Sequence, residues 1–158
     1  MKKILVPVDF SKHSEYALEV AAAIAKKEGS EIIALHMMGL NDAVLTRNQT
    51  NEVFEAMYYM KLAETRFTEL LDKDYLKDVK VTDTVHNYTN FSEINDIAKE
   101  MKIDLIVMGS HGTTGMKEVF VGSNTEKVVR TSEIPVLVIK HRAENFNPKF
   151  GIFACDFL

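Results

Sequence analysis

Apolar residues along this chain follow two alternating patterns. Short, nearly continuous apolar runs indicate strands; they cover residues 2–8, 31–38, 79–85, 104–108 and 134–139. Longer segments repeat apolar residues every three or four positions, which predicts helices; they cover residues 11–28, 52–73, 92–101 and 124–131. In the second of these helices we expect the Met and Tyr side chains of residues 57–60 to form core or interface packing.

Strict alternation of strand and helix is typical of an α/β fold. We therefore predict an open five-stranded parallel sheet with helices on both faces, a Rossmann-like arrangement with right-handed crossovers. Ligands of such sheets bind outside the carboxyl ends of the strands, where the strand order reverses. Asp9, Met37 and Gly109 lie at the ends of the first, second and fourth predicted strands, so we expect them to share this edge.

Residues 109–123 join the fourth strand to the last helix and carry most of the candidate chemistry. Strand-to-helix loops usually have about 2–6 residues, and a much longer loop is most often explained by a ligand. Glycines let a backbone approach an anion closely, and the start of a helix offers free N–H groups, so we predict a phosphate site. The structural alternative is that Gly109 makes a turn while Ser123 and Glu126 form a capping box.

Composition narrows the classes of function. The 158 residues are typical of one domain, and a net charge of −4 argues against a nucleic-acid or anionic-membrane partner. The lone cysteine, Cys155, allows no intrachain disulfide and no Cys-based zinc site. No signal peptide and no apolar run of about 18 residues is present. We expect a cytoplasmic protein.

The glycine spacing resembles a known motif. The loop is neither a P-loop nor the dinucleotide fingerprint, but its pattern Gly-x2-Gly-x9-Gly-Ser resembles the nucleotide-binding signature of the universal stress protein family. The resemblance continues along nearly all of residues 1–140, most clearly in residues 4–11, 35–37, 104–112 and 135–139. It implies an ATP-binding α/β domain, for which we predict the bounds 1–142.

The resemblance also implies a role for each matching residue. Asp9 and the backbone at Met37 would contact the adenine, and Pro7 and Gly109 would lie beside the ribose. The phosphates, with Mg²⁺ or Mn²⁺ bound to them, would be held by Gly112, Gly122, Ser123 and Asn124.

Little in the sequence points to turnover of the nucleotide. Lys117 could meet a phosphate or simply be exposed, and we interpret His111 as a surface loop residue. No obvious general base or arginine finger is present. We therefore assign no catalytic residue and expect slow ATP hydrolysis or none. Residues 86–91 also lack the Gly-x-Pro common there in the family, which leaves the shape of the neighbouring wall open.

Two functions of different classes remain open. The first is a nucleotide-dependent regulator in the stress response, which the complete glycine set favours. The second is a dimeric interaction or scaffold module that does not use nucleotide. An adenylating enzyme would need a Ser-Gly-Gly loop after the first strand or a His-x-Gly-His signature, whereas residues 9–13 read Asp-Phe-Ser-Lys-His.

The C-terminal segment resembles the opening of the chain. Residues 150–157 place an apolar run before an Asp-Phe pair, as residues 3–10 do, and residues 145–149 have the composition of a linker. We interpret 143–158 as a linker and the first strand of a second, truncated repeat; a native C-terminal tail is the alternative. The strand Val136–Ile139 or this tail would form a homodimer contact.

Overall fold

The computed structural model describes residues 1–39, 51–87, 91–111, 122–144 and 146–147. Its strands form one parallel sheet in the order β3-β2-β1-β4-β5. Their bounds are β1 Lys3–Pro7, β2 Glu31–Met38, β3 Val81–Asn87, β4 Leu105–Gly109 and β5 Val136–Ile139. The predicted five-stranded parallel sheet is confirmed, and its order reverses between β1 and β4.

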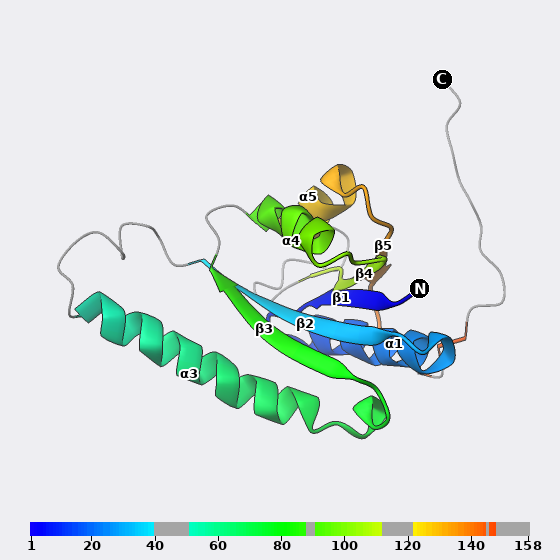
Figure 1. Cartoon of the computed structure of the whole chain (residues 1–158), viewed down its shortest axis with the longest axis horizontal. Helices are drawn as coiled ribbons and strands as arrows, with labels where there is room; N and C mark the ends of the chain where they lie inside the picture. Colours follow the sequence, from blue (N-terminus) through cyan, green and yellow to red (C-terminus); the bar gives the residue numbers. More distant parts are fainter. Residues whose placement is uncertain (40–50, 88–90, 112–121, 145, 148–158) are drawn as a thin grey trace.

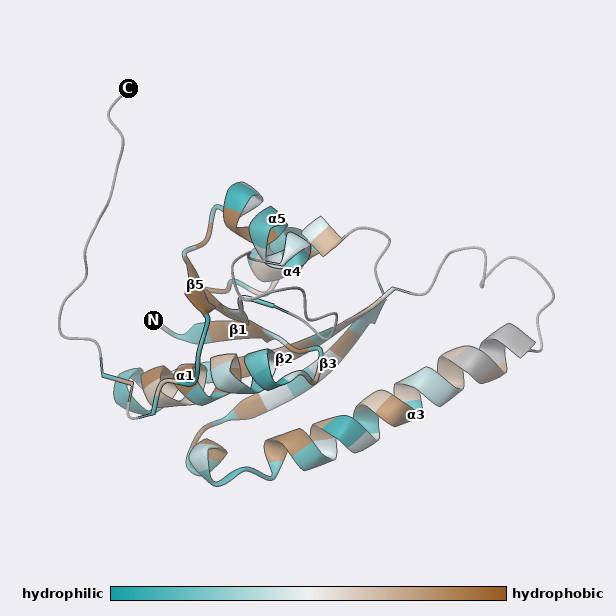
Figure 2. Cartoon of the chain, turned by 180° about the vertical axis from the view of Figure 1, so that it is seen from behind, coloured by the Kyte–Doolittle hydropathy of each residue, from teal (hydrophilic) through white to brown (hydrophobic). Residues whose placement is uncertain are grey.

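Helices cover both faces of this sheet (Figure 1 and Figure 2). Their bounds are α1 Lys12–Glu28, α3 Asn51–Leu71, α4 Ile94–Glu100 and α5 Ser123–Thr131, with short 3-10 turns at Asp74–Leu76 and Phe91–Glu93. One core joins α1 and the end of α3 to the sheet through side chains such as Ala21 and Phe67. A second core joins α4 and α5 to the opposite face through Ile94 and Val128.

The first helix begins and ends where its sequence predicts. Ser11 is the N-cap, and its hydroxyl accepts a hydrogen bond from the Ser14 backbone N–H at 3.3 Å. Gly29 ends the helix with φ 66°, a left-handed conformation that glycine adopts without steric cost. The alanines at 17, 21, 22 and 25 are buried, so the helix packs close to the sheet.

Two predicted boundaries are wrong for local reasons. The strand predicted over 134–139 begins at Val136, because Ser132 and Ile134 form a turn closed by bonds to the Ser132 hydroxyl. The helix predicted over 92–101, for which the sequence offers Asn90 or Ser92 as the cap, starts at Ile94 after a 3-10 turn. Its N-cap, Glu93, makes no side-chain capping bond. Asn90 lies outside the described residues.

Candidate functional site

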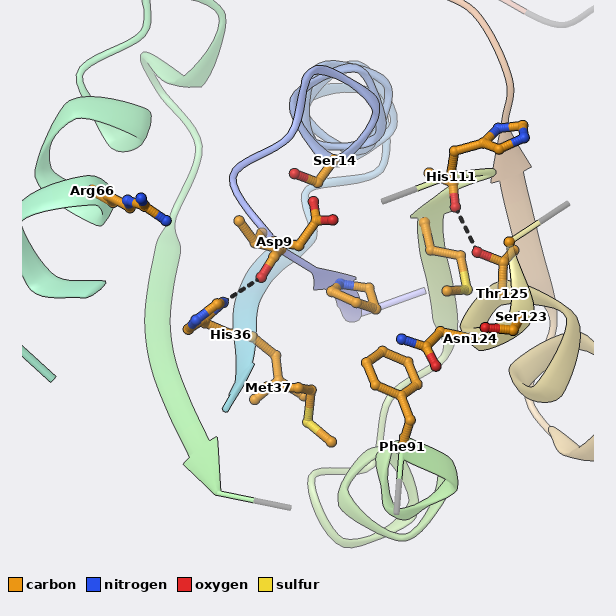
Figure 3. Close-up of a pocket in the computed structure, with 16 residues that line it drawn as sticks. Asp9, Ser14, His36, Met37, Arg66, Phe91, His111, Ser123, Asn124 and Thr125 are labelled. Carbon is orange, nitrogen blue, oxygen red and sulfur yellow. Dashed lines mark hydrogen bonds between the residues drawn. The ribbon is translucent and has the colours of Figure 1, made fainter. Parts of the chain in front are cut away.

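A cavity of about 430 Å³ opens at the carboxyl edge of the sheet, at the point where the strand order reverses (Figure 3). The ends of β1, β2 and β4 form its floor, and α1, α3, α5 and the 3-10 turn before α4 contribute walls. Seven of the eight residues predicted to hold the nucleotide line it: Pro7, Asp9, Met37, Gly109, Gly122, Ser123 and Asn124. The eighth, Gly112, lies outside the described residues, as does Lys117.

One end of the cavity is the N-terminus of α5. Gly122 is the N-cap and makes no side-chain capping bond, so Ser123 is the first helical residue rather than the cap. The predicted capping box is therefore wrong, and Glu126 instead forms an i,i+4 pair with Arg130 at 3.0 Å. Because the first N–H groups of a helix have no partner within it, this end suits an anion.

Gly122 and Gly109 bring the backbones at this end unusually close. The Gly122 N–H donates to the Ser110 carbonyl at 2.7 Å, and a Cβ on Gly122 would lie 3.3 Å from that same oxygen. A Cβ on Gly109 would lie 2.8 Å from the backbone carbon of His13 in the first turn of α1. Gly109 therefore allows α1 to cross the end of β4, and Gly122 allows α5 to begin beside it.

Thr125 fixes the start of α5 to the sheet, a role that the sequence analysis missed. Its side chain is 4% exposed, and its hydroxyl donates to the Gly109 carbonyl at 2.9 Å (Figure 3). The one signal in the sequence is its spacing, since Thr125 lies three residues before the buried Val128 and so shares its face of the helix.

Asp9 lines the cavity from the turn after β1. The Ser11 N–H donates to its Oδ1 at 3.0 Å. The preceding carbonyl, that of Val8, accepts a hydrogen bond of 2.7 Å from Nδ1 of His36, which fixes the imidazole as the tautomer protonated at Nδ1 (Figure 3). These bonds fix both the backbone at the end of β1 and the side chain of β2 that lies next to it.

Arg66 lines the end of the cavity opposite α5 and packs against Phe10, which does not line the cavity itself. Phe10 has φ 61°, and its ring packs 4.7 Å from His36 and 5.1 Å from Phe67. The Arg66 guanidinium lies 5.6 Å above the centre of the Phe10 ring and lines the cavity (Figure 3). Sequence reasoning missed Arg66, because a single arginine in the middle of a helix carries no distinguishing pattern.

His111 is half-buried and lines the cavity, so its interpretation as a surface loop residue needs revision. Its Nδ1 lies 2.8 Å from Ser110 Oγ, and its ring lies 5.4 Å from that of His13. Its Nε2 is buried and has no hydrogen-bond partner among the described residues. His111 is thus a polar group that a ligand could satisfy.

No group of three or more His, Cys, Asp or Glu side chains in the described ranges could hold a metal ion. A divalent cation in this cavity would accordingly depend on oxygen atoms of the ligand. The residues that would face such a ligand fit an anionic, partly aromatic molecule: a helix N-terminus with a hydroxyl and an amide at one end, and Asp9 with an apolar floor at the other.

A model of the Universal stress protein family matches residues 1–140. The chain belongs to the universal stress protein family. Universal stress protein MJ0577 of Methanocaldococcus jannaschii is 36% identical over 155 residues, covering 89% of this chain and 96% of that protein. Universal stress protein YxiE of Bacillus subtilis is 32% identical over 146 residues, covering 87% and 98%.

Solved structures of universal stress proteins share the fold. The structure of MJ0577 has a TM-score of 0.75 at 33% identity and covers 87% of this chain and 94% of its own. A universal stress protein from Archaeoglobus fulgidus, solved in complex with dAMP, has a TM-score of 0.57 at 20% identity and covers 87% and 97%. In this universal stress protein, no described helix is long and apolar enough to cross a membrane.

Proposed function

We propose that this universal stress protein binds ATP, with Mg²⁺ or Mn²⁺ on the phosphates, and acts as a nucleotide-dependent regulator in the cytoplasm with little or no hydrolysis. The observation that carries the proposal is one cavity lined by seven residues that the family resemblance assigns to the nucleotide. The complex of the Archaeoglobus fulgidus relative with dAMP supports a nucleotide in this fold.

The chemistry of the cavity gives the nucleotide a direction. Its phosphates would lie at the start of α5, where backbone N–H groups, the Ser123 hydroxyl and the Asn124 amide can donate to phosphate oxygens. The adenine would lie over the ends of β1 and β2, where the Asp9 carboxylate can accept from its exocyclic amine. Arg66 would then flank the base, at the far end from the phosphates.

Calorimetry with the full chain tests this assignment. We expect MgATP to bind, and mass spectrometry of the denatured protein to detect co-purified adenine nucleotide. Asn124→Leu should weaken ATP binding at least about tenfold, or 1.4 kcal/mol, because it removes a donor and crowds the phosphate end. The matched control is Lys127→Leu, an exposed position of α5 that does not line the cavity. No binding at millimolar MgATP would contradict the proposal.

A dimeric scaffold that does not use nucleotide is the second candidate function. Its support is that β5 forms one edge of the described sheet and carries half-buried Val136, Leu137 and Val138, so a second β5 could pair with it. This function predicts a dimer whose dissociation constant is the same with and without MgATP. Val138→Lys should then dissociate the dimer, whereas Asn124→Leu should leave it intact.

A further inference from the structure

The first half of α3 exposes an apolar surface that nothing in the nucleotide site uses. Phe54, Met57 and Tyr58 are 70%, 63% and 65% exposed, and the adjoining Tyr59 and Met60 are 41% and 40% exposed. Figure 1 shows α3 diverging from the sheet toward its N-terminal end, where these residues lie. Contiguous exposed apolar side chains mark interaction sites more often than scattered ones do.

The outward face of α3 changes from apolar to polar side chains along the helix. Ala63, Phe67 and Leu70 are buried and mark the side that faces the body of the protein. The opposite side carries positions spaced by four, three, four and three residues, the repeat of a helix–helix seam; they are Phe54, Tyr58, Lys61, Thr65 and Thr68. The two threonine hydroxyls donate to carbonyls of their own helix. The seam is therefore apolar only over its first two turns and ends at Lys61.

We propose that this surface binds a second copy of the chain through an antiparallel contact between the two α3 helices. A twofold axis between Met57 and Tyr58 places each Tyr58 ring against the thioether of Met57 in the second copy, a favourable sulfur–aromatic contact. The same axis places each Lys61 beside Phe54 of the second copy. There the lysine stem covers the exposed ring, and its ammonium lies near the ring face.

Self-complementarity favours a second copy over a lipid surface. A twofold contact needs a patch that matches itself in reverse, and an axis between Met57 and Tyr58 pairs Phe54 with Lys61 and Met57 with Tyr58 in both directions. Helices that lie on anionic membranes carry a basic polar face. The exposed charges that follow on α3 are of both signs: Lys61 and Arg66 against Glu64 and Glu69.

The contact is small. Stable interfaces bury about 800 Å² on each partner, more than five side chains of one helix provide, so we expect reversible association that rises with protein concentration. The α3 surface and the β5 edge lie on opposite sides of the sheet order. If β5 also dimerises the protein, the α3 contact joins those dimers into larger assemblies.

Sedimentation velocity of the full chain over a range of concentrations tests the surface. Tyr58→Glu should raise the dissociation constant of the α3 contact at least about tenfold, because it places two like charges near the axis. Thr68→Glu is the matched control, since it adds the same charge to the same seam beyond the apolar turns. Unchanged unfolding temperature and MgATP affinity confirm that Tyr58→Glu still folds. Equal association of the two variants would overturn the proposal.

Cysteine cross-linking tests the register, in a Cys155→Ser background. A mixture of Phe54→Cys and Lys61→Cys chains should form a disulfide between the two variants. Lys61→Cys alone should not, because its two copies lie about 10 Å apart along the helices, beyond the reach of a disulfide. If Lys61→Cys alone forms as much intermolecular disulfide as the mixture does, the antiparallel register is overturned. Flotation of the chain with anionic vesicles, lost in Tyr58→Glu, would overturn the proposal in favour of a lipid surface.

Discussion

Phe10 has an unfavourable left-handed backbone conformation that its neighbours must hold in place. A bulky residue at φ 61° is unfavourable, and such conformations persist only where surrounding contacts hold them. Here His36, Phe67 and Arg66 surround the ring. Since Phe10 follows Asp9 directly, these contacts hold the backbone next to Asp9, and Arg66 would support the base end of the proposed site through them.

Arg66→Ala should therefore weaken nucleotide binding about tenfold, or 1.4 kcal/mol. The loss should be the same for ATP, ADP and AMP, because Arg66 lies at the end opposite the start of α5. Asn124→Leu should instead reduce the affinity for ATP more than the affinity for AMP. Calorimetric titrations of both variants with the three nucleotides give the comparison. If the loss of affinity in Arg66→Ala grows with the number of phosphates, the nucleotide binds in the reverse direction.

Gly109 and Gly122 differ in what a side chain would meet. Gly109→Ala should destabilise the fold by about 1–3 kcal/mol, as overpacking does, because its Cβ would lie within 2.9 Å of three His13 atoms. Gly122→Ala should cost less, since its nearest neighbour is 3.3 Å away. Urea unfolding of the two variants measures the difference. Equal stability would show that α1 can move away from β4 without penalty.

The same geometry changes the interpretation of a valine at position 122. From the sequence we expect Gly122→Val to abolish ATP binding without disturbing the fold, by blocking the phosphates. The Cβ would meet the Ser110 carbonyl and, at 3.6 Å, His111 Cα. The loss of binding should thus come with displacement of the start of α5, and Asn124→Leu is the cleaner probe.

At the scale of elements, different side-chain hydrogen bonds hold the two ends of the central strands β1 and β4. At the carboxyl edge, Thr125 bonds α5 to the end of β4. At the amino edge, Asp104 bonds the start of β1 to the start of β4, since its Oδ2 accepts from the backbone N–H groups of Lys2 at 2.6 Å and Lys3 at 2.9 Å. Together these hydrogen bonds fix both ends of the region where β1 and β4 pair, and the carboxyl ends of these two strands form part of the cavity floor.

Asp104 makes the amino edge sensitive to acid. The hydrogen bonds from the backbone of Lys2 and then of Lys3 hold the pKa of Asp104 below its ordinary value of 3.8. A lowered pKa in the fold means that the carboxylate stabilises the protein above pH 3.8 and that this contribution is lost as the pH falls through the lowered pKa. Asp104→Asn should reduce the unfolding free energy at pH 7 and flatten its acid dependence. Urea unfolding at pH 7 and near pH 3 tests this, and parallel pH curves for variant and parent would contradict it.

At the scale of the whole molecule, periodicity was sufficient to predict the sheet, because buried strands and amphipathic helices leave distinct patterns. The glycine spacing and the family resemblance together named seven of the cavity residues. Arg66 could not be found this way, since its place opposite α5 depends on how α3 packs. Ser123 and Glu126 have the sequence spacing of a capping box. The N-cap is nevertheless Gly122, whose N–H donates a hydrogen bond to the Ser110 carbonyl, so the helix begins one residue earlier than that motif requires. The Met and Tyr side chains of residues 57–60 are exposed, so the prediction that they pack in the core is wrong. The alternative, that they pack in an interface, stays a prediction.

Because the cavity is built from strands and helices of both cores, a bound nucleotide should stabilise the whole fold. A ligand that binds only the folded state at 100 times its dissociation constant adds about 2.7 kcal/mol to the unfolding free energy. We expect MgATP to raise the unfolding temperature of the parent and of Tyr58→Glu equally, because α3 contributes Arg66 to the site and its apolar surface lies elsewhere on the helix. Asn124→Leu should show little rise at the same MgATP concentration. Differential scanning calorimetry decides: a rise in Asn124→Leu equal to that of the parent would place the nucleotide outside this cavity, and a smaller rise in Tyr58→Glu would couple the two surfaces.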